Sequence, residues 1–238
     1  MKTEKFIESL NTSRSSVFSF CDLKKILGKN ENYCKIFLNR LKTKGFLIKL
    51  EKGKYALSNQ NSLIVASNIV FPSYISFSSA YYFYALTTQI PTTIFVVARK
   101  QKKEIFYEGS SFKFIKFSRK RFFGYKREIL EGKTLFVAEI EKAILDSLFL
   151  PQYAPIFQTY STLKEAKIDK EKLLEYLKKF DSRIVAKRAG YLLELIGIDF
   201  YDELKKFLNK NYELLNPLKK KSSLKNEKWK LIINEVLE

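Results

Sequence analysis

The chain has 238 residues, 46% hydrophobic and 29% charged, and is long enough to bury a sizeable core without disulfides or metals. Lysine and arginine number 44 against 25 acidic residues, and this net charge of +19 favours a polyanionic partner; a lysine-rich solvated surface is the alternative. Histidine is absent, which excludes Ser-His-Asp, Cys-His and HExxH sites, and two cysteines, Cys21 and Cys34, are too few for a disulfide framework or a thiolate metal site.

The first sixty residues carry 13 basic and five acidic residues and predict three helices followed by a hairpin. We expect helices over Thr3–Leu10, from a cap at Ser19 to Gly28, and from a cap at Asn30 to Gly45. Two short strands, FLIKL and KYAL, then flank a tight turn at Gly53. This order is typical of a winged helix-turn-helix, with a small helical domain or a protein-binding module as the alternative.

The third helix has two different faces. At about 100° per residue, four apolar residues point inward: Cys34, Phe37, Leu38 and Leu41. The opposite face mixes amides, cations and one aliphatic residue: Asn32, Lys35, Ile36, Asn39, Arg40 and Thr43. Asn pairs with adenine edges, Arg with guanine, and Lys with phosphate. The candidate DNA-binding residues are therefore Asn32, Lys35, Asn39 and Arg40 on this helix, and Lys52 and Lys54 on the hairpin.

Residues 61–98 contain no charged residue at all. A membrane helix needs about 20 uninterrupted apolar residues, whereas this stretch is broken by Pro72 and Pro91 and is rich in Ser and Thr. We therefore expect soluble elements: a helix over 61–70, a helix from about Ser76 as its cap to Leu86, and a strand Thr93–Ala98 buried on both faces.

The following segment alternates short β-type runs with turns. Strands are expected over 104–107, 112–117, 125–130 and 134–138, and then an amphipathic helix in AEIEKAILDSLFL. On that helix we expect an internal ion-pair set of Lys142 with Glu141 and Asp146. The carboxylates Glu139, Glu141 and Asp146 do not converge on one point at their spacing, which argues against a metal-dependent nuclease.

The last third predicts three amphipathic helices, a basic loop NPLKKKSSLKNEK and a final strand in KWKLIINEVLE that returns to the middle sheet. The loop is either a solvated segment or a second footprint on DNA or on an acidic protein. Gly190 is expected to permit the close approach of another helix. The predicted domains are 1–60, a winged helix-turn-helix; 61–160, an α+β core; and 161–238, a mostly helical region. The fold class is α+β.

Three motifs resemble the AbiEi family of abortive-infection antitoxins and related transcriptional regulators of viral defence. They are PSYISFSSAYYFYALTTQIP, EKAILD and RAGYLLELIG, behind a KGKY hairpin. Ile140 stands where the family usually has proline, and Tyr84 or Ala85 where it often has glycine. The resemblance implies a DNA-binding repressor that autoregulates its operon and counteracts a nucleotidyltransferase-like toxin. It implies no fixed toxin-contacting residues that we can assign here.

The sequence thus predicts a non-enzymatic, cytoplasmic repressor without cofactor or metal. Its expected partner is double-stranded DNA, an operator with an inverted repeat, and it has no membrane contact. The charged N-terminus, MKTEKFIESLNTSRSS, lacks the apolar run of a signal peptide. Two alternatives stay open: a winged-helix regulator without a toxin partner, and a basic nucleic-acid-processing enzyme. Against the enzyme, the sequence has no GxxxxGK[ST] or GxGxxG motif, and no paired aspartates follow Gly109-Ser110. The oligomeric state is not set by the sequence.

Overall fold

The computed structural model describes residues 3–237, and contacts divide the chain into two compact units. The first contains residues up to Ile75 together with Pro91–Phe117 and Lys126–Val137; the second contains Ser76–Ile90, Ser118–Tyr125 and the residues from Ala138 onward. Both helices and strands are abundant, so the fold class is α+β, as the sequence predicts. The predicted domains 1–60, 61–160 and 161–238 are continuous in sequence, whereas the two contact units are not, so these domains stay a prediction.

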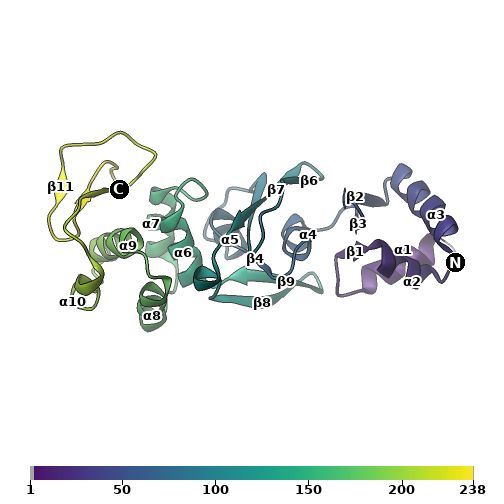
Figure 1. The fold of residues 1–238 in the computed structure, drawn as a ribbon, viewed down its shortest axis with the longest axis horizontal. Coiled ribbons are helices and arrows are strands. Elements are labelled where there is room, and N and C mark those ends of the chain that lie inside the picture. The colour runs from purple at the N-terminus through teal and green to yellow at the C-terminus, as the bar shows by residue number, and fades with distance from the viewer. Residues whose placement is uncertain (1–2, 238) are drawn as a thin grey trace. The chain divides into compact units, whose positions relative to one another are not determined.

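The first unit begins with three helices and a small sheet (Figure 1). The elements are α1 Thr3–Thr12, β1 Val17–Ser19, α2 Phe20–Leu27, α3 Glu31–Thr43, β2 Leu47–Glu51 and β3 Lys54–Leu57. Strand β3 lies between β1 and β2 and is antiparallel to both, with Ala56 opposite Val17 on one side and Ile48 on the other. The three helices and the hairpin confirm the expected elements. Strand β1 was not predicted, because three residues are too few to show an alternation of apolar and polar side chains.

A compact apolar core holds these elements together. It contains Phe6 and Leu10 of α1, Leu23 and Leu27 of α2, the inward residues of α3, and Phe18, Leu47 and Leu57 of the sheet. All of them are at most 7% exposed. Burying side chains of this size stabilises a fold by about 1.5–3 kcal/mol each, so this core fixes the angle at which α3 is presented.

The rest of the first unit is a mixed sheet with one helix. Helix α4 Ser62–Asn68 precedes six strands: β4 Ser73–Ile75, β5 Thr93–Ala98, β6 Ile105–Tyr107, β7 Ser110–Lys116, β8 Tyr125–Leu130 and β9 Lys133–Ala138. Their order is β6-β7-β5-β4-β9-β8, with β5 parallel to β7 and antiparallel to β4. The expected central strand is confirmed at Thr93–Ala98, and β4 is an additional strand that follows the cis peptide at Phe71-Pro72.

Two side chains tie the small sheet and α1 to this larger sheet within the first unit. Lys133 is buried, at 8% exposure, and its ammonium donates to the carbonyl oxygens of Leu10, Asn11 and Ser13 at 3.1, 2.9 and 2.8 Å. These carbonyls belong to the C-terminal end of α1 and the loop after it, where backbone acceptors lack helical partners. The Tyr107 hydroxyl donates to the Leu57 carbonyl at 2.7 Å.

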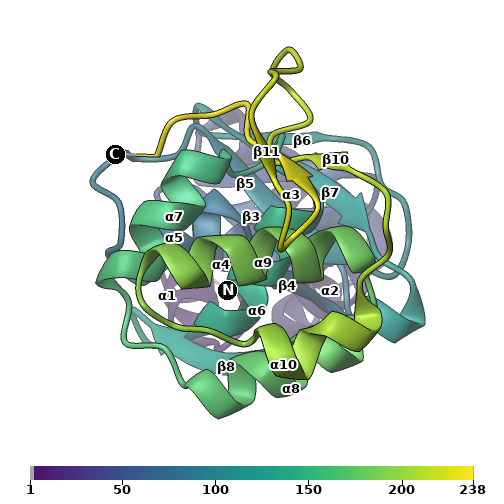
Figure 2. The same cartoon turned by 90° about the vertical axis from the view of Figure 1, so that its left-hand side faces the viewer.

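The second unit is mainly helical, and α6 packs against α7, α8 and α9 (Figures 1 and 2). Its elements are α5 Ser78–Phe83, the 3-10 turn η1 Arg119–Arg121, α6 Ile140–Phe149, α7 Ile156–Glu165, α8 Lys170–Phe180, α9 Arg183–Leu195, α10 Tyr201–Leu204 and η2 Lys205–Phe207. Three two-residue strands follow: β10 Glu213–Leu214, β11 Lys225–Asn226 and β12 Leu231–Ile232. Strand β12 lies between β10 and β11, so the expectation that the final strand returns to the middle sheet is wrong.

Two local predictions in this unit are corrected. Ser76 does not cap α5, because the helix begins after Phe77, whose φ is +58°, and the Ser76 hydroxyl instead donates to Asp146 Oδ2 at 2.7 Å. Gly190 does admit a close neighbour, but that neighbour is the ring of Trp229: a Cβ at Gly190 would lie 2.1 Å from Cζ3 of the indole. A side chain from a distant segment, not a second helix, occupies the space that the missing methyl leaves.

The expected ion pair on α6 is present between Lys142 and Asp146, both with fully buried side chains. Glu141 is not part of it, because its Oε1 accepts from the Asp169 backbone N–H at 3.0 Å. Burial lowers the pKa of Lys142, an effect that the neighbouring Asp146 carboxylate opposes. Over residues 3–237, no helix combines the length and the apolarity that crossing a membrane requires.

Candidate nucleic-acid interface

Local hydrogen bonds cap the N-terminus of α3 and both ends of α2. Asn30 caps its N-terminus, with Oδ1 accepting from the Tyr33 N–H at 2.9 Å. The preceding helix begins with a capping box between Ser19 and Asp22 and ends at Gly28, whose φ of +63° suits glycine. Only three residues separate α2 from α3, so the outer face of α3 is positioned by short, capped connections.

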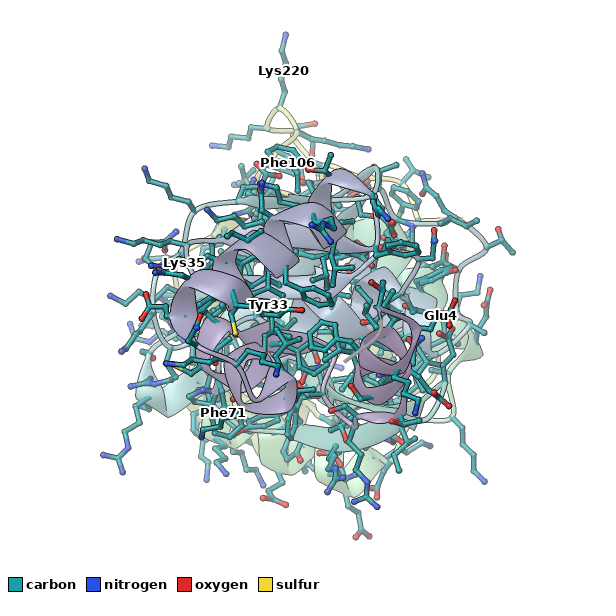
Figure 3. The ribbon with its side chains drawn as sticks, turned by 90° about the vertical axis from the view of Figure 1, so that its right-hand side faces the viewer. Glu4, Tyr33, Lys35, Phe71, Phe106 and Lys220 are labelled. Atoms are coloured by element: carbon teal, nitrogen blue, oxygen red, sulfur yellow. The ribbon has the colours of Figure 1, made fainter. Side chains whose placement is uncertain are left out.

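The structure places the residues predicted for DNA binding on two neighbouring elements. On α3, Asn32, Lys35, Asn39 and Arg40 are all exposed, on the side opposite the buried stripe. Lys52 is exposed in the turn between β2 and β3, next to Gly53 with a φ of +78°. Figure 3 shows Lys35 and Tyr33 at the surface of α3.

A groove of about 320 Å³ lies between α3 and the β2–β3 hairpin. Its polar lining consists of Lys35, Asn39, Lys42, Lys49 and Lys52, and its remaining walls are Phe20, Leu38, Gly53 and Tyr55. No Asp or Glu occurs among these lining residues. Four lysines that share one concave surface create a positive potential that attracts an anionic ligand.

Two of these lysines, Lys42 and Lys49, were not among the predicted site residues. Lys42 lies three residues after Asn39 and therefore on the flank of the helix that faces the hairpin. Lys49 is the outward residue between the less exposed Ile48 and Leu50 of β2. The charge of Lys49 favours an exposed position in the sequence, but only the placement of the hairpin beside α3 brings it to the groove.

Lys54, by contrast, has structural partners inside the first unit. Its ammonium donates to the Ile69 carbonyl at 2.5 Å and pairs with Glu51 Oε1 at 3.1 Å. Glu51 also accepts from Lys102, with 2.5 Å between Oε2 and Nζ. Burial alone would raise the pKa of Glu51, but the hydrogen bonds from Lys102 and Lys54 outweigh burial and lower that pKa. Lys54 is thus the predicted residue least free to reach a ligand.

Lys35 also has a partner, but a weak one. It forms an i,i+4 ion pair with Glu31 at 2.5 Å, and both side chains are more than half exposed. The hydrogen bond from Lys35 lowers the pKa of Glu31. An exposed pair of this kind contributes little to stability, so Lys35 can exchange Glu31 for a phosphate at small cost.

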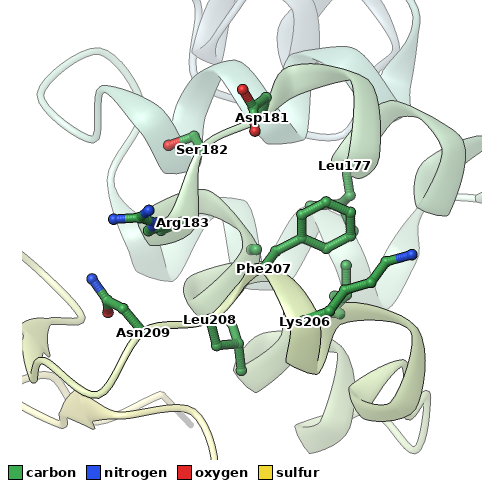
Figure 4. A pocket seen from close by; sticks show the side chains of 10 residues that line it. Leu177, Asp181, Ser182, Arg183, Lys206, Phe207, Leu208 and Asn209 are labelled. Carbon is green, nitrogen blue, oxygen red and sulfur yellow. The ribbon is translucent and has the colours of Figure 1, made fainter.

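A second cavity, of about 270 Å³, lies in the second unit (Figure 4). It is bordered by the end of α8, the start of α9 and residues 204–209. Asp181 at its rim is paired with Lys120. Among residues 3–237, no group of three or more His, Cys, Asp or Glu side chains is placed to hold a metal ion.

No protein-family model matches the chain, and no curated protein matches it. Among solved structures, the chain is similar to the RV2827C protein from Mycobacterium tuberculosis, with a TM-score of 0.66. That similarity covers 96% of this chain and 90% of the other, at 15% sequence identity. At this identity the comparison shows a shared fold across nearly the whole chain.

Proposed function

We propose that the first sixty residues form a winged helix-turn-helix that binds double-stranded DNA, with α3 as the recognition helix and the β2–β3 hairpin as the wing. The order of α1, β1, α2, α3, β2 and β3 supports this proposal, as does the antiparallel three-stranded sheet. The short connection between α2 and α3 is typical of the motif. In such modules the second helix of the pair lies in the major groove.

The observation that carries the proposal is the groove between α3 and the hairpin, with its four lysines and one asparagine. Lysines on both sides of a concave surface can neutralise phosphates on the strands that border the major groove. Asn32, Asn39 and Arg40 lie on the exposed face of α3 and are the types of side chain that pair with base edges. The same surface therefore combines groups for affinity with groups for sequence preference.

A salt titration tests the electrostatic part of this proposal. If Lys35, Lys42, Lys49 and Lys52 each neutralise one phosphate, log K for a duplex falls against log salt concentration with a slope of about −3.6. Lys52→Ala should reduce the magnitude of that slope by about 0.9 and weaken binding to all sequences alike. Binding of fluorescent duplexes at several salt concentrations measures both quantities.

The matched control is Lys178→Ala, which removes one positive charge from the exposed surface of α8 and leaves the groove intact. It should leave the slope unchanged. Asn39→Ala and Arg40→Ala should instead reduce the preference for a selected site by about 1–3 kcal/mol each. A slope near zero for the unmodified protein would refute salt-dependent DNA binding. Equal slopes for Lys52→Ala and Lys178→Ala, with binding intact, would refute a phosphate contact at this surface.

The sequence resemblance to AbiEi supports a more specific role, a repressor that acts on its own operon and counteracts a nucleotidyltransferase-like toxin. A footprint on the promoter of its own gene tests the first part, and an inverted repeat there would indicate two-fold binding. Co-expression with a neighbouring transferase-like gene, scored by cell growth, tests the second. Growth arrest that this protein does not relieve would leave the regulator without a toxin partner as the better proposal.

A further inference from the structure

One residue on the proposed recognition surface is apolar. Ile36 is 65% exposed, whereas the other aliphatic residues of α3, Leu38 and Leu41, are 2% and 0% exposed. Isoleucine is a poorer helix former than the Lys, Glu or Arg that usually occupy exposed helix positions, so local stability does not favour it here. What sets Ile36 apart from other exposed apolar residues is its position on the proposed recognition face, among side chains suited to base contacts.

Ile36 lies at the centre of the exposed face of α3. On a helix with 3.6 residues per turn, Asn32, Asn39 and Arg40 all project within about 60° of it. The groove lysines, Lys35 and Lys42, lie further round on the hairpin side, at roughly 100–120°. If α3 enters the major groove, Ile36 points at the base pairs, and Lys35 and Lys42 point at the phosphate backbone of one DNA strand.

We infer that Ile36 contacts the C5 methyl group of a thymine in the major groove and so gives α3 a preference for T at one position of its site. This inference rests on the DNA binding proposed above. The thymine methyl is the one apolar group that the base pairs display in that groove, and apolar side chains read it by contact. Isoleucine is branched at Cβ and stiff at χ1, so it presents its methyl groups with little loss of rotamer freedom on binding.

Deoxyuridine isolates this contact, because it differs from thymidine only by that methyl group. A duplex selected for tight binding is remade with single T→dU replacements at each T, and Kd is measured at one fixed salt concentration. For the unmodified protein, one replacement should raise Kd about fourfold, the value expected for losing one buried methyl contact. For Ile36→Ala, the same replacement should change Kd by less than about 1.5-fold, since its partner is already gone.

Ile129→Ala is the matched control. Ile129 is 69% exposed on β8, so its truncation removes the same atoms from an equally exposed isoleucine outside α3. This variant should bind as the unmodified protein does and keep the fourfold response to dU. Ile36 is exposed, so its truncation should leave thermal unfolding unchanged and a folding defect cannot mimic the result.

The outcomes separate the inference from the function on which it rests. An equal dU effect in the unmodified protein and in Ile36→Ala, with specific, salt-dependent binding intact, overturns the contact with Ile36 and leaves DNA binding in place. Absence of salt-dependent binding to any duplex overturns the proposed function, and the inference with it. A dU effect that disappears in Ile36→Ala alone supports both.

Discussion

Replacing Gly190 by alanine tests the packing between α9 and the C-terminal segment. The added methyl carbon would lie 2.1, 2.2 and 2.6 Å from three carbons of the Trp229 ring. Carbon atoms in contact prefer separations of about 3.5–4.0 Å, so the ring has to move by more than 1 Å or α9 has to shift. The ring of Trp229 cannot move this far without loss of packing, because it is fully buried and its Nε1–H donates to Glu194 Oε2 at 2.5 Å.

Two opposing effects set the size of the change. Alanine favours a helix interior over glycine by about 1 kcal/mol. Overpacking a buried site costs about 1–3 kcal/mol, and expelling a tryptophan approaches the 3–5 kcal/mol of a Trp→Ala change. We take about 3 kcal/mol for the steric cost, so Gly190→Ala should lower the free energy of unfolding by about 2 kcal/mol.

Trp229 is the single tryptophan in the chain, so its fluorescence during urea unfolding reports the environment of this contact directly. A double-mutant cycle with Trp229→Leu, followed by far-UV circular dichroism, provides the control. With the indole removed, Gly190→Ala should be neutral or stabilise by up to about 1 kcal/mol. Stabilisation of the unmodified background by Gly190→Ala would refute the close contact between the glycine and the ring.

Three further predictions concern buried and half-buried polar groups. Lys142→Met should lower the free energy of unfolding by about 3–5 kcal/mol, because the buried Asp146 carboxylate loses its countercharge. The double variant Lys142→Met/Asp146→Leu should recover much of this loss in the same urea assay. Glu51→Gln should destabilise by about 0.5–1 kcal/mol at pH 7. Lys102 and Lys54 lower the folded-state pKa of Glu51, so its contribution is present above the unfolded value of about 4.3 and is lost as pH falls through the lower, folded-state pKa. Unfolding measured at a series of pH values from 7 downward should show the difference between the two proteins shrink below the unfolded value. Tyr107→Phe should cost about 1–2 kcal/mol in thermal unfolding because a β3 carbonyl loses its donor, and an undiminished melting temperature would contradict that role.

Local chemistry was enough to predict the three helices and the hairpin within the first sixty residues. Ser19, Gly28 and Asn30 mark the ends of helices through interactions within three or four residues, and all three act as the caps expected of them. Where a partner is distant in sequence, the prediction failed. Ser76 has the side chain of a cap, yet its hydroxyl bonds to Asp146, 70 residues away. Periodicity contains no information about such a partner.

The candidate site likewise contains residues that the sequence predicts and residues that only the tertiary structure brings to it. The exposed face of α3 follows from a single helical period, so Asn32, Lys35, Asn39 and Arg40 could be chosen from the sequence. The groove could not, because it depends on the angle between α3 and the hairpin. That angle adds Lys42 and Lys49 to the site. Lys54 is instead bonded to the Ile69 carbonyl, a contact with a residue 15 positions away that the hairpin pattern does not predict.

Four buried residues of the motifs that resemble the AbiEi family differ in environment from the exposed residues of α3 that we propose for recognition. Tyr74, Ile75, Lys142 and Asp146 belong to the motifs that resemble those of AbiEi proteins, and each is completely buried. Tyr74 and Ile75 pack in the core, and Lys142 and Asp146 pair as buried charges, so a substitution of any one of them alone costs stability. The exposed residues of α3 are under no such constraint and lie outside those motifs. The resemblance therefore bears on the scaffold, and the sequence of the DNA site has to be determined from α3 itself.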